Sequence, residues 1–466
     1  MIFSSVPFLY YFLPITLLVY FIVPRAFKNT VLMTASLVFY GWGEPRYLIL
    51  MIVSILVGYG GGLLIEKHRG KRAALWLTWI TVGILLSFLG YFKYANFFID
   101  NFNAVTGLSV SFLRIALPVG ISFYTFQILS YDVDVYRGDV KAQRNIVDLA
   151  AYVTMFPQLI AGPIVRYSDI EVQLRTRTHS FEKIAVGIRR FVIGLAKKIL
   201  IADVLAALCD TFRASDEKSV LFYWMYAIAF SLNIYFDFSG YSDMAIGLGK
   251  ILGFDFLENF NYPYISASVT EFWRRWHMSL GSWFRDYVYI PLGGNRVSKT
   301  RWFFNIFVVW MLTGFWHGAA WNFILWGLLF AVLLVLEKLW LLKALSKMKI
   351  INHIYVLFFV MISFVLFNAA DLPQAYNDVI SLFGANGLQA VSAETLYYLK
   401  SYMPILIVAV IGATPLPATL GKKALSSGFG GIVSIIAEPL MLIGLLIVMT
   451  AYLVDGSFSP FLYFRF

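Results

Sequence analysis

The sequence predicts an all-α fold, a polytopic bundle of transmembrane helices, and two observations support this prediction. Of the 466 residues, 60% are hydrophobic and 14% are charged, and the mean hydropathy is +0.75. Soluble domains are roughly 45–50% apolar and about 25% charged. Apolar runs also recur along the whole chain, and several reach the roughly 20 residues that a helix needs to cross a bilayer. No internal repeat or linker divides the chain, so we expect a single membrane domain over residues 1–466.

About eleven apolar runs define the expected spans. They lie at 8–23, 30–42, 47–64, 73–92, 191–208, 221–236, 303–316, 321–336, 354–368, 402–416 and 431–453. The shorter runs predict tilted, broken or re-entrant segments. The first run has no basic residues before it and ends at Pro24 and Arg25 rather than at a small-residue cleavage site. We therefore expect a retained span and not a removed signal peptide.

The basic residues between the runs predict an orientation. Arg25 and Lys28 follow the first run, and the segment 66–72 follows the third. Because cytoplasmic loops are enriched in Lys and Arg, we expect an external amino terminus and two cytoplasmic loops. This rule also accounts for the net charge of +11, since no basic stripe with interleaved aromatics indicates a nucleic-acid partner. The single cysteine, Cys209, excludes an intrachain disulfide and a CxxC site.

The segment 148–165 is expected to be re-entrant. It lies between Arg144 and a group of basic residues that begins at Arg166, and both flanks are predicted to be cytoplasmic. Its sequence FPQLIAGP contains Gln158, Gly162 and Pro163. Such irregular backbone is tolerated at membrane depth only where it is buried in protein or lines a wet cavity.

The stretch YFDFSGYSD, residues 235–243, is polar for its place directly after an apolar run. Asp237 and Asp243 at the end of a span are expected to face the bundle interior, a cavity or water, because lipid does not tolerate carboxylates. Gly240 would allow the helix to break there. The alternative is a plain helix end at which Asp and Ser side chains cap the backbone.

The stretch EFWRRWHMSLGSWFRD, residues 271–286, predicts one amphipathic helix, interfacial or folded inward. At a helical period, Phe272, Trp276, Ser279 and Trp283 share one side, and arginines flank it. His277 is the unusual member. It is either a functional group or a histidine at headgroup level beside arginines.

His317 lies in the stretch TGFWHGAAWNF, with no charged residue from Trp302 through Leu336. A titratable group inside a membrane is costly, so function is the default interpretation. Gly314 and Gly318 would let another backbone or a substrate approach it closely. A neutral imidazole, with a pKa of about 6.5, can take a proton from an attacking hydroxyl. A metal site that joins both histidines to Asp237 or Asp243 is the weaker alternative, because no HExxH or other short ligand spacing is present.

Several motifs together resemble the membrane-bound O-acyltransferase (MBOAT) family, over nearly the whole chain. The similarity is to the branch of bacterial alginate O-acetyltransferase membrane subunits and related peptidoglycan and exopolysaccharide acetylation proteins. The motifs are YFDFSGYSDMAIGLG (235–249), EFWRRWHMSL (271–280), RDYVYIPLGGN (285–295), WHGAAW (316–321), LGYFKYANFF (89–98), LPVGISFYTFQILSYDVDVYRG (117–138), FPQLIAGPIVRY (156–167), the first fifteen residues and the terminal PFLYF (460–464). Residues 343–456 match only loosely.

The resemblance implies an all-helical body with a tunnel across a bacterial cytoplasmic (inner) membrane. The essential histidine of the family falls on His317, and its second polar position falls on His277. An acyl thioester, acetyl-CoA or an acyl carrier, would enter from the cytosol, with no cofactor bound permanently. The acceptor would be a hydroxyl of an extracytoplasmic polysaccharide or of a relay partner protein. The other residues that it assigns to the tunnel are Asp237, Ser239, Tyr241, Asp243, Trp273, Arg274, Trp276, Ser279, Trp316 and Asn322.

Three alternatives remain open at this point. The chain could be a D-alanyl or lipid O-acyltransferase of the same family. A secondary transporter would also carry intramembrane polar groups, although it usually has two related halves, and no duplication is visible here. A scaffold for a secreted enzyme would need neither histidine. The acceptor polymer and the acyl chain cannot be read from these residues.

Overall fold

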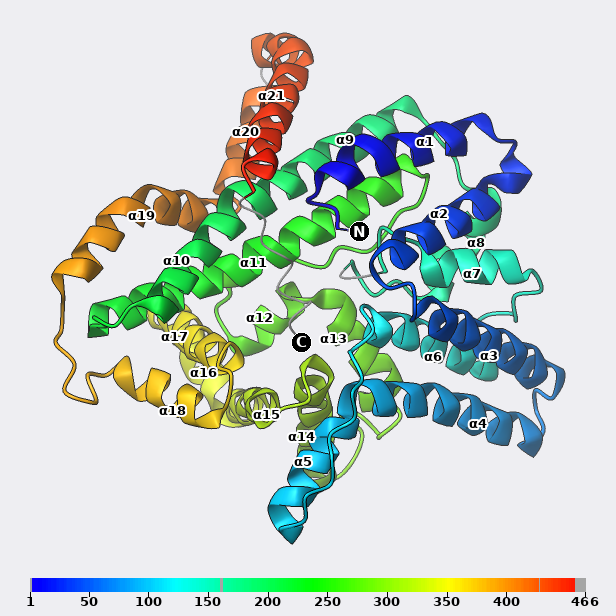
Figure 1. The fold of residues 1–466 in the computed structure, drawn as a ribbon, viewed down its shortest axis with the longest axis horizontal. Helices are drawn as coiled ribbons and strands as arrows, with labels where there is room; N and C mark the ends of the chain where they lie inside the picture. Colours follow the sequence, from blue (N-terminus) through cyan, green and yellow to red (C-terminus); the bar gives the residue numbers. More distant parts are fainter. Residues whose placement is uncertain (1, 160–161, 427, 457–466) are drawn as a thin grey trace. The chain divides into compact units, whose positions relative to one another are not determined.

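The computed structural model describes residues 2–159, 162–426 and 428–456, and throughout these ranges the regular structure is helical (Figure 1). The chain divides into two compact units. The first comprises Met1–Phe191 and Met244–Leu257, and the second Val192–Asp243 and Glu258–Phe466. Two of the three divisions fall inside α9 (Phe181–Ala196) and α11 (Val220–Ile251), and the third lies between Leu257 and Glu258, after α11. The terminal motif at 460–464 lies outside the described residues.

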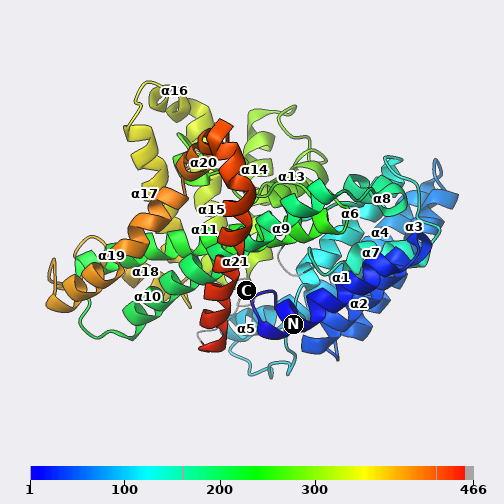
Figure 2. The same cartoon turned by 90° about the horizontal axis from the view of Figure 1, so that it is seen from above.

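The first unit is built on α6, against which α3 and α4 pack (Figures 1 and 2). Two glycines of α3 allow the close packing: a Cβ on Gly58 would overlap Ile128, and one on Gly62 would lie 2.7 Å from the hydroxyl of Tyr131. Small residues are common where membrane helices approach each other closely. The elements of this unit before α9 are η1 (Phe8–Phe12), α1 (Leu13–Ile22), η2 (Arg25–Phe27), α2 (Lys28–Gly43), α3 (Leu48–Lys67), α4 (Arg72–Leu89), η3 (Gly90–Tyr94), α5 (Ala95–Thr106), α6 (Ile121–Arg137), α7 (Ile146–Thr154) and α8 (Tyr167–Thr176).

The segment predicted to be re-entrant contains a short helix, α7, of nine residues. At 1.5 Å per residue it is about 13 Å long, too short for a hydrocarbon core of about 30 Å. After α7 the described backbone is irregular and buried against protein: the N–H of Phe156 donates to Ser36 Oγ at 3.0 Å. A Cβ on Gly162 would lie 2.7 Å from Cα of Gln158, and Pro163 is also buried. Entry and exit on one membrane face stay a prediction.

The second unit contains the stretches around both histidines. Its core is rich in aromatic side chains from α11, α12, α15 and α17. After the end of α9, its elements are η4 (Lys197–Ala202), α10 (Asp203–Ala214), α11, η5 (Pro263–Ile265), α12 (Val269–Arg275), α13 (Met278–Phe284), η6 (Arg285–Tyr289), α14 (Lys299–His317), α15 (Trp321–Leu336), η7 (Glu337–Leu341), α16 (Leu342–Leu345), α17 (Ile351–Phe367), α18 (Leu372–Ser381), α19 (Ala393–Gly412), α20 (Leu416–Ser426) and α21 (Gly428–Val454).

α14 and α15 form the most closely packed helix pair of this unit (Figures 1 and 2). A Cβ on Gly314 would overlap the carbonyl oxygen of Phe323, and one on Gly327 would overlap that of Trp310. The close backbone approach expected at Gly314 is therefore confirmed. It holds the end of α14, where His317 lies, against α15.

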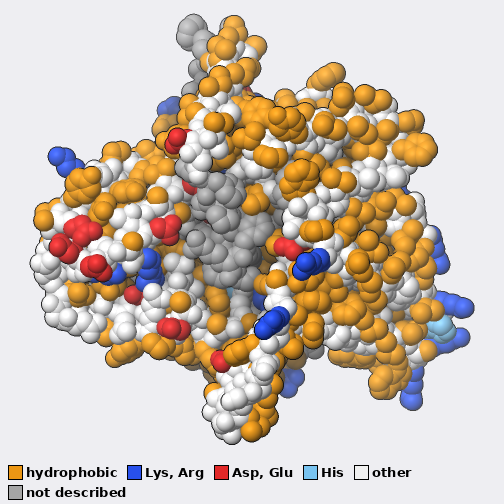
Figure 3. All heavy atoms as spheres, viewed as in Figure 1, with side chains coloured by type: hydrophobic (Ala, Val, Ile, Leu, Met, Phe, Trp, Pro, Cys, Tyr) orange, Lys and Arg blue, Asp and Glu red, His pale blue; other side chains and the backbone are white. Residues whose placement is uncertain are grey.

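Six helices within the described residues are long and apolar enough to cross a membrane, and the multi-pass helical prediction is confirmed. They are Leu48–Lys67, Arg72–Thr106, Val220–Ile251, Trp321–Leu345, Ala393–Gly412 and Ile435–Val454, with shorter apolar helices at Phe8–Ile22 and Ile351–Phe367. The remaining predicted spans are also helical but do not reach these limits. The run 191–208, for example, contains Lys197, Lys198 and Asp203. Hydrophobic side chains cover much of the surface in Figure 3, as expected for a protein solvated by lipid.

Candidate active site

His277 lies in the break between α12 and α13, in the left-handed conformation with φ 44° and ψ 52°. The prediction of one helix over 271–286 is therefore wrong. The backbone turns here because it bonds to a distant segment: the N–H of Asn261 donates to the carbonyl of Arg275 at 2.9 Å, and that of Met278 donates to the carbonyl of Asn259 at 3.0 Å. These two bonds replace some of the backbone hydrogen bonds that a continuous helix over 271–286 would form.

Asn259 fixes the tautomer of His277, and sequence reasoning missed this residue. Its Oδ1 accepts from the N–H of Ser279 at 3.2 Å, from Ser279 Oγ at 2.9 Å, and lies 3.1 Å from His277 Nδ1. Because a backbone N–H can only donate, the amide must present its oxygen here. Nδ1 of His277 therefore carries the proton, and Nε2 keeps its lone pair. The Asn259 Nδ2 donates to Ser242 Oγ at 3.1 Å, which holds the amide in place.

The environment of His277 favours the neutral imidazole. The side chain is 1% exposed, and its ring packs edge-on against Phe238 with 4.6 Å between centroids. Burial lowers the pKa of His277 to about 3, because the charged form is desolvated. At neutral pH this residue is therefore an uncharged hydrogen-bonding group rather than an ion.

His317 is the last residue of α14 and is buried among aromatic rings. Its ring centroid lies 5.0 Å from Trp316, 5.1 Å from Trp326 and 5.4 Å from Phe367. Trp316 is also 6.2 Å from His277. Both predicted histidines thus lie within 6.2 Å of the ring of one tryptophan, although they are 40 positions apart in the sequence.

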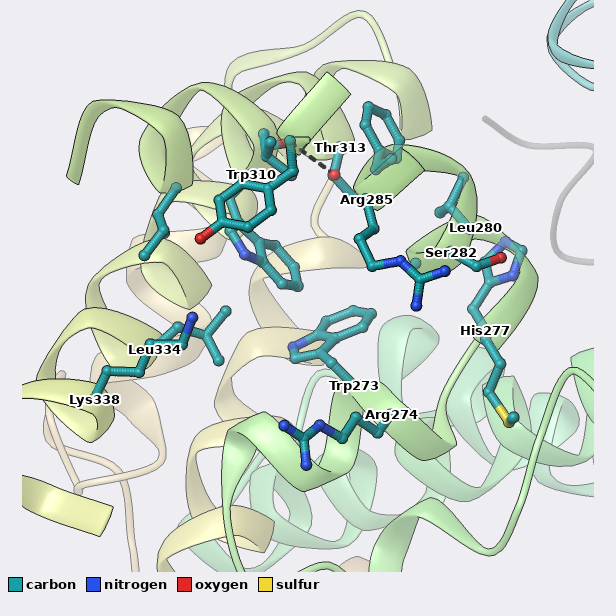
Figure 4. Close-up of a pocket in the computed structure, with 16 residues that line it drawn as sticks. Trp273, Arg274, His277, Leu280, Ser282, Arg285, Trp310, Thr313, Leu334 and Lys338 are labelled. Atoms are coloured by element: carbon teal, nitrogen blue, oxygen red, sulfur yellow. Dashed lines mark hydrogen bonds between the residues drawn. The ribbon is translucent and has the colours of Figure 1, made fainter. Parts of the chain in front are cut away.

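A cavity of about 590 Å³ opens beside His277. In Figure 4, Trp273 projects into the middle of it, with Arg274 and Arg285 on opposite sides and His277 at one edge. Among the described residues, no Asp or Glu lines the cavity, and neither does His317. Its lining consists of Trp273, Arg274, His277, Met278, Leu280, Gly281, Ser282, Phe284, Arg285, Tyr289, Ile306, Val309, Trp310, Thr313, Leu334 and Lys338.

The polar residues of α11 lie within a continuous helix, and Asp237 is buried in the protein interior as expected. α11 runs unbroken through Gly240, so both the predicted break and the alternative of a capped helix end are wrong. A Cβ on Gly240 would lie 2.7 Å from the carbonyl oxygen of Gly194, so the glycine serves close helix packing instead. Asp237 pairs with Lys198 at 2.8 Å, and Asp243 pairs with Lys197 at 2.6 Å.

Ion pairing explains how these carboxylates are tolerated inside the protein. Lys198 also contacts Asp203 at 2.6 Å. Ser239 and Tyr241 are buried on the same helix. None of the four predicted residues of α11 lines the cavity beside His277.

Trp276 and Asn322, which were also predicted to line the tunnel, do not line the cavity beside His277. Trp276 packs in an aromatic group with Phe272 and Phe260. Asn322 Nδ2 donates to the carbonyl of Ala369 at 3.0 Å, close to the ring of Phe367 that contacts His317 in turn. Within the part of the chain that the structure describes, no group of three or more His, Cys, Asp or Glu could hold a metal ion.

Comparisons with known proteins agree with this architecture. The sequence profile of MBOAT, the membrane-bound O-acyltransferase family, matches residues 140–370. A protein of Azotobacter vinelandii named "Probable alginate O-acetylase AlgI" is 40% identical, with 100% of both chains covered. The "Peptidoglycan O-acetyltransferase" of Helicobacter pylori is 35% identical over 83% of this chain and 81% of the relative. The "Teichoic acid D-alanyltransferase" of Bacillus subtilis is 33% identical over 46% of this chain and 58% of the relative.

These similarities extend across the stretches that build the site. The matched range 140–370 contains His277, His317, Asn259 and the whole lining of the cavity. With 40% identity over the full length of one relative, the chain belongs to the membrane-bound O-acyltransferase family and is a multi-pass membrane enzyme of the O-acyltransferase class.

Proposed function

We propose that this enzyme transfers an acyl group, acetyl, from a cytosolic thioester to a hydroxyl of an extracytoplasmic polysaccharide, or to a partner protein that relays it. The names of its relatives support acetyl transfer to alginate or peptidoglycan. The observation that carries the proposal is the arrangement around Trp316: a neutral His277 of fixed tautomer at the edge of a cationic cavity, and His317 beside the same indole ring. The proposed location is the bacterial cytoplasmic membrane.

The cavity beside His277 is the proposed entrance for the thioester donor. Arg274, Arg285 and Lys338 line it, and its described lining residues include no Asp or Glu, although Arg285 pairs with Asp286 at 2.6 Å. Coenzyme A and the prosthetic arm of an acyl carrier protein both carry phosphates, which Arg and Lys bind strongly. The thioester end would then point toward His277. No resident cofactor is required, because the donor arrives already activated.

His317 is the proposed general base. It terminates α14, and the partial negative charge at a helix C-terminus stabilises an imidazolium. His277 keeps its Nε2 lone pair and is neutral, so it is suited to accept a hydrogen bond from a second hydroxyl of the acceptor and orient it, because the single proton of the attacking hydroxyl passes to His317. This refines the expected role of His277, since Nε2 without a proton cannot donate to the thioester carbonyl.

The proposed reaction follows from these roles. The hydroxyl oxygen attacks the thioester carbonyl carbon while its proton passes to His317. The C–S bond then breaks, and the leaving thiolate takes that proton back from the imidazolium. The products are an ester and a free thiol. General base catalysis contributes about 10²–10⁴-fold, and holding both reactants in position can contribute more.

Transfer from labelled acetyl-CoA to a soluble glycan, measured with the purified full chain in detergent, tests the proposal. Arg274→Gln and Lys338→Gln should raise KM for the donor several-fold with little change in kcat, because phosphate contacts remote from the reacting atoms act on binding. Lys299→Gln, an exposed cation outside the cavity, is the matched control. If the wild-type protein neither hydrolyses nor transfers the acetyl group, and instead exchanges an intact substrate across vesicles, it is a transporter. Inactivity in both assays supports a scaffold.

D-alanyl transfer is the second candidate, because the Bacillus subtilis relative is named for it. A D-alanyl group attached to a carrier protein is the corresponding donor. The same assay with this donor separates the candidates: the acetyl proposal expects at least tenfold higher kcat/KM with acetyl-CoA.

A further inference from the structure

A group of three cations in the first unit has no role in the proposed acyl transfer. Arg25 lies in η2, Lys28 begins α2, and Arg177 follows α8; we call these three residues the basic cluster. Arg25 Nη2 donates to the carbonyl of Arg177 at 3.4 Å. Lys28 Nζ lies 4.5 Å from the ring centroid of Tyr20, and the guanidinium of Arg177 lies 5.6 Å from the same centroid. Lys28 and Arg177 thus lie beside the same tyrosine ring, and Arg25 is joined to Arg177 by a hydrogen bond.

Arg177 anchors the basic cluster from inside the protein. It is 8% exposed, and it is held by neutral oxygens: Nε donates to the hydroxyl of Tyr20 at 2.7 Å and Nη1 to Asn29 Oδ1 at 2.7 Å. Its Nη2 is buried and has no hydrogen-bond acceptor among the residues that the structure describes. A buried guanidinium is normally compensated by a carboxylate. No carboxylate among the described residues compensates Arg177 in this way.

Two carboxylates of the first unit are already engaged by other partners. Asp148 accepts from Asn29 Nδ2 at 2.7 Å, and Asp255 pairs with Lys183 at 2.6 Å and Lys250 at 3.0 Å. Within residues 2–159, 162–426 and 428–456, no member of the basic cluster forms a salt bridge. An uncompensated positive charge of this kind attracts an anion.

The electrostatic effect is visible on neighbouring groups. Burial, followed by the charges of Arg177 and Arg25, lowers the pKa of Lys28. The pKa of His179, whose Nε2 lies 3.0 Å from the hydroxyl of Tyr20, is lowered by burial and by the charges of Lys28 and Arg177. Both groups are therefore destabilised in their charged forms, and a bound anion would relieve this.

Exposed apolar side chains border the basic cluster in the sequence. Ile22 is 72% exposed at the end of α1, and Phe27 is 58% exposed between Arg25 and Lys28. A site for a small soluble anion needs no such border. Cations that alternate with exposed apolar groups are instead typical of the bilayer interface, where a headgroup and acyl chains meet. Arg25 and Lys28 also belong to the loop predicted to be cytoplasmic, and anionic lipids are abundant in the cytoplasmic leaflet.

We propose that the basic cluster binds the phosphate of an anionic phospholipid in the cytoplasmic leaflet, with the lipid chains lying along Ile22 and Phe27. Arg25 is exposed and Lys28 is partly exposed, and these two side chains contact the phosphate. Arg177 is buried and contributes its positive charge without contacting the phosphate. The site is independent of acyl transfer.

Native mass spectrometry of the detergent-purified full chain tests the proposal. Short-chain phosphatidylglycerol and phosphatidylethanolamine are titrated in parallel, and inorganic phosphate is then added as a competitor. A Lys or Arg near a charged membrane surface contributes about five-fold to affinity. Arg25→Gln with Lys28→Gln should therefore weaken phosphatidylglycerol binding by about 25-fold, while Lys28→Arg should keep it. Lys71→Gln, an exposed cation of the other predicted cytoplasmic loop, is the matched control.

The proposal predicts a preference for phosphatidylglycerol over phosphatidylethanolamine that the double variant loses and the control keeps. Equal binding of the two lipids, or equal losses in the double variant and in Lys71→Gln, would overturn it. If millimolar inorganic phosphate binds and displaces the lipid completely, the cluster is a site for a free phosphate and the assignment to a lipid is wrong. Arg177 is left unchanged throughout, because it is part of the folded interior.

Discussion

Replacement of Asn259 by Ala tests how His277 is held in its site. Asn259 Oδ1 accepts from the backbone N–H and the hydroxyl of Ser279 and lies within hydrogen-bond distance of His277 Nδ1. In Asn259→Ala the hydroxyl of Ser279 can rotate away, but the backbone N–H and the imidazole N–H remain buried without this acceptor. A buried unsatisfied donor costs about 1–3 kcal/mol. The two together should lower the free energy of unfolding by about 2–6 kcal/mol.

The same substitution should impair catalysis through the tautomer. Without Asn259, the proton of His277 can move to Nε2, and the ring can shift. A displacement of about 1 Å can lower a rate by about 10²-fold, so we expect a fall in kcat of that order with KM for the thioester donor little changed. The measurements are acetyl transfer from labelled acetyl-CoA and thermal unfolding of the same detergent-purified samples.

Two variants control this prediction. Ser279→Ala removes one hydrogen bond to Asn259 and leaves the contact with His277, so it should keep at least half of the activity. Asn259→Asp preserves an oxygen for the N–H donors, so it should unfold at a higher temperature than Asn259→Ala. If Asn259→Ala is as active as the wild type while His277→Ala is inactive, the argument from the tautomer fails. Equal loss in Asn259→Ala and Ser279→Ala would also contradict it.

Four further predictions concern the histidines, helix packing and topology. His317→Ala should lose nearly all acyl transfer. His277→Asn should retain far more activity than His277→Ala, because Asn tolerates a φ of 44°. If His277→Asn is as inactive as His317→Ala while a folded His317→Gln variant keeps near-normal transfer, the assigned roles are reversed. Because burial keeps the pKa of His277 at about 3, its imidazole stays neutral above about pH 5, so His277→Asn should leave the shape of the pH–rate profile above pH 5 unchanged. Gly314→Ala should lower the unfolding temperature, since its Cβ would overlap a backbone oxygen of α15, whereas Gly83→Ala meets no atom within 4 Å and should have little effect. A cysteine introduced at Gly70 should not react with an impermeant reagent in intact cells; labelling there would refute the predicted orientation.

Much of the fold could be predicted because the bilayer constrains composition strongly. A helix solvated by lipid must be apolar over its length, so the helical spans follow from hydropathy. The close contact at Gly314 could also be predicted, since glycines beside an isolated polar residue stand out in an apolar run. The number of spans was less predictable, because short apolar runs such as 191–208 contain charges that are neutralised by partners in the folded protein.

Other features of the site depend on contacts between segments that are separate in the sequence. Periodicity predicted one helix over 271–286, but hydrogen bonds to residues 259–261 divide it at His277. Gly240 suggested a break, yet it lies where α11 packs against the backbone of Gly194. The sequence alone determined that this is a helical membrane acyltransferase with two candidate histidines. Only the tertiary structure decided which nitrogen of His277 carries its proton, because the amide of Asn259 that settles it lies 18 positions away.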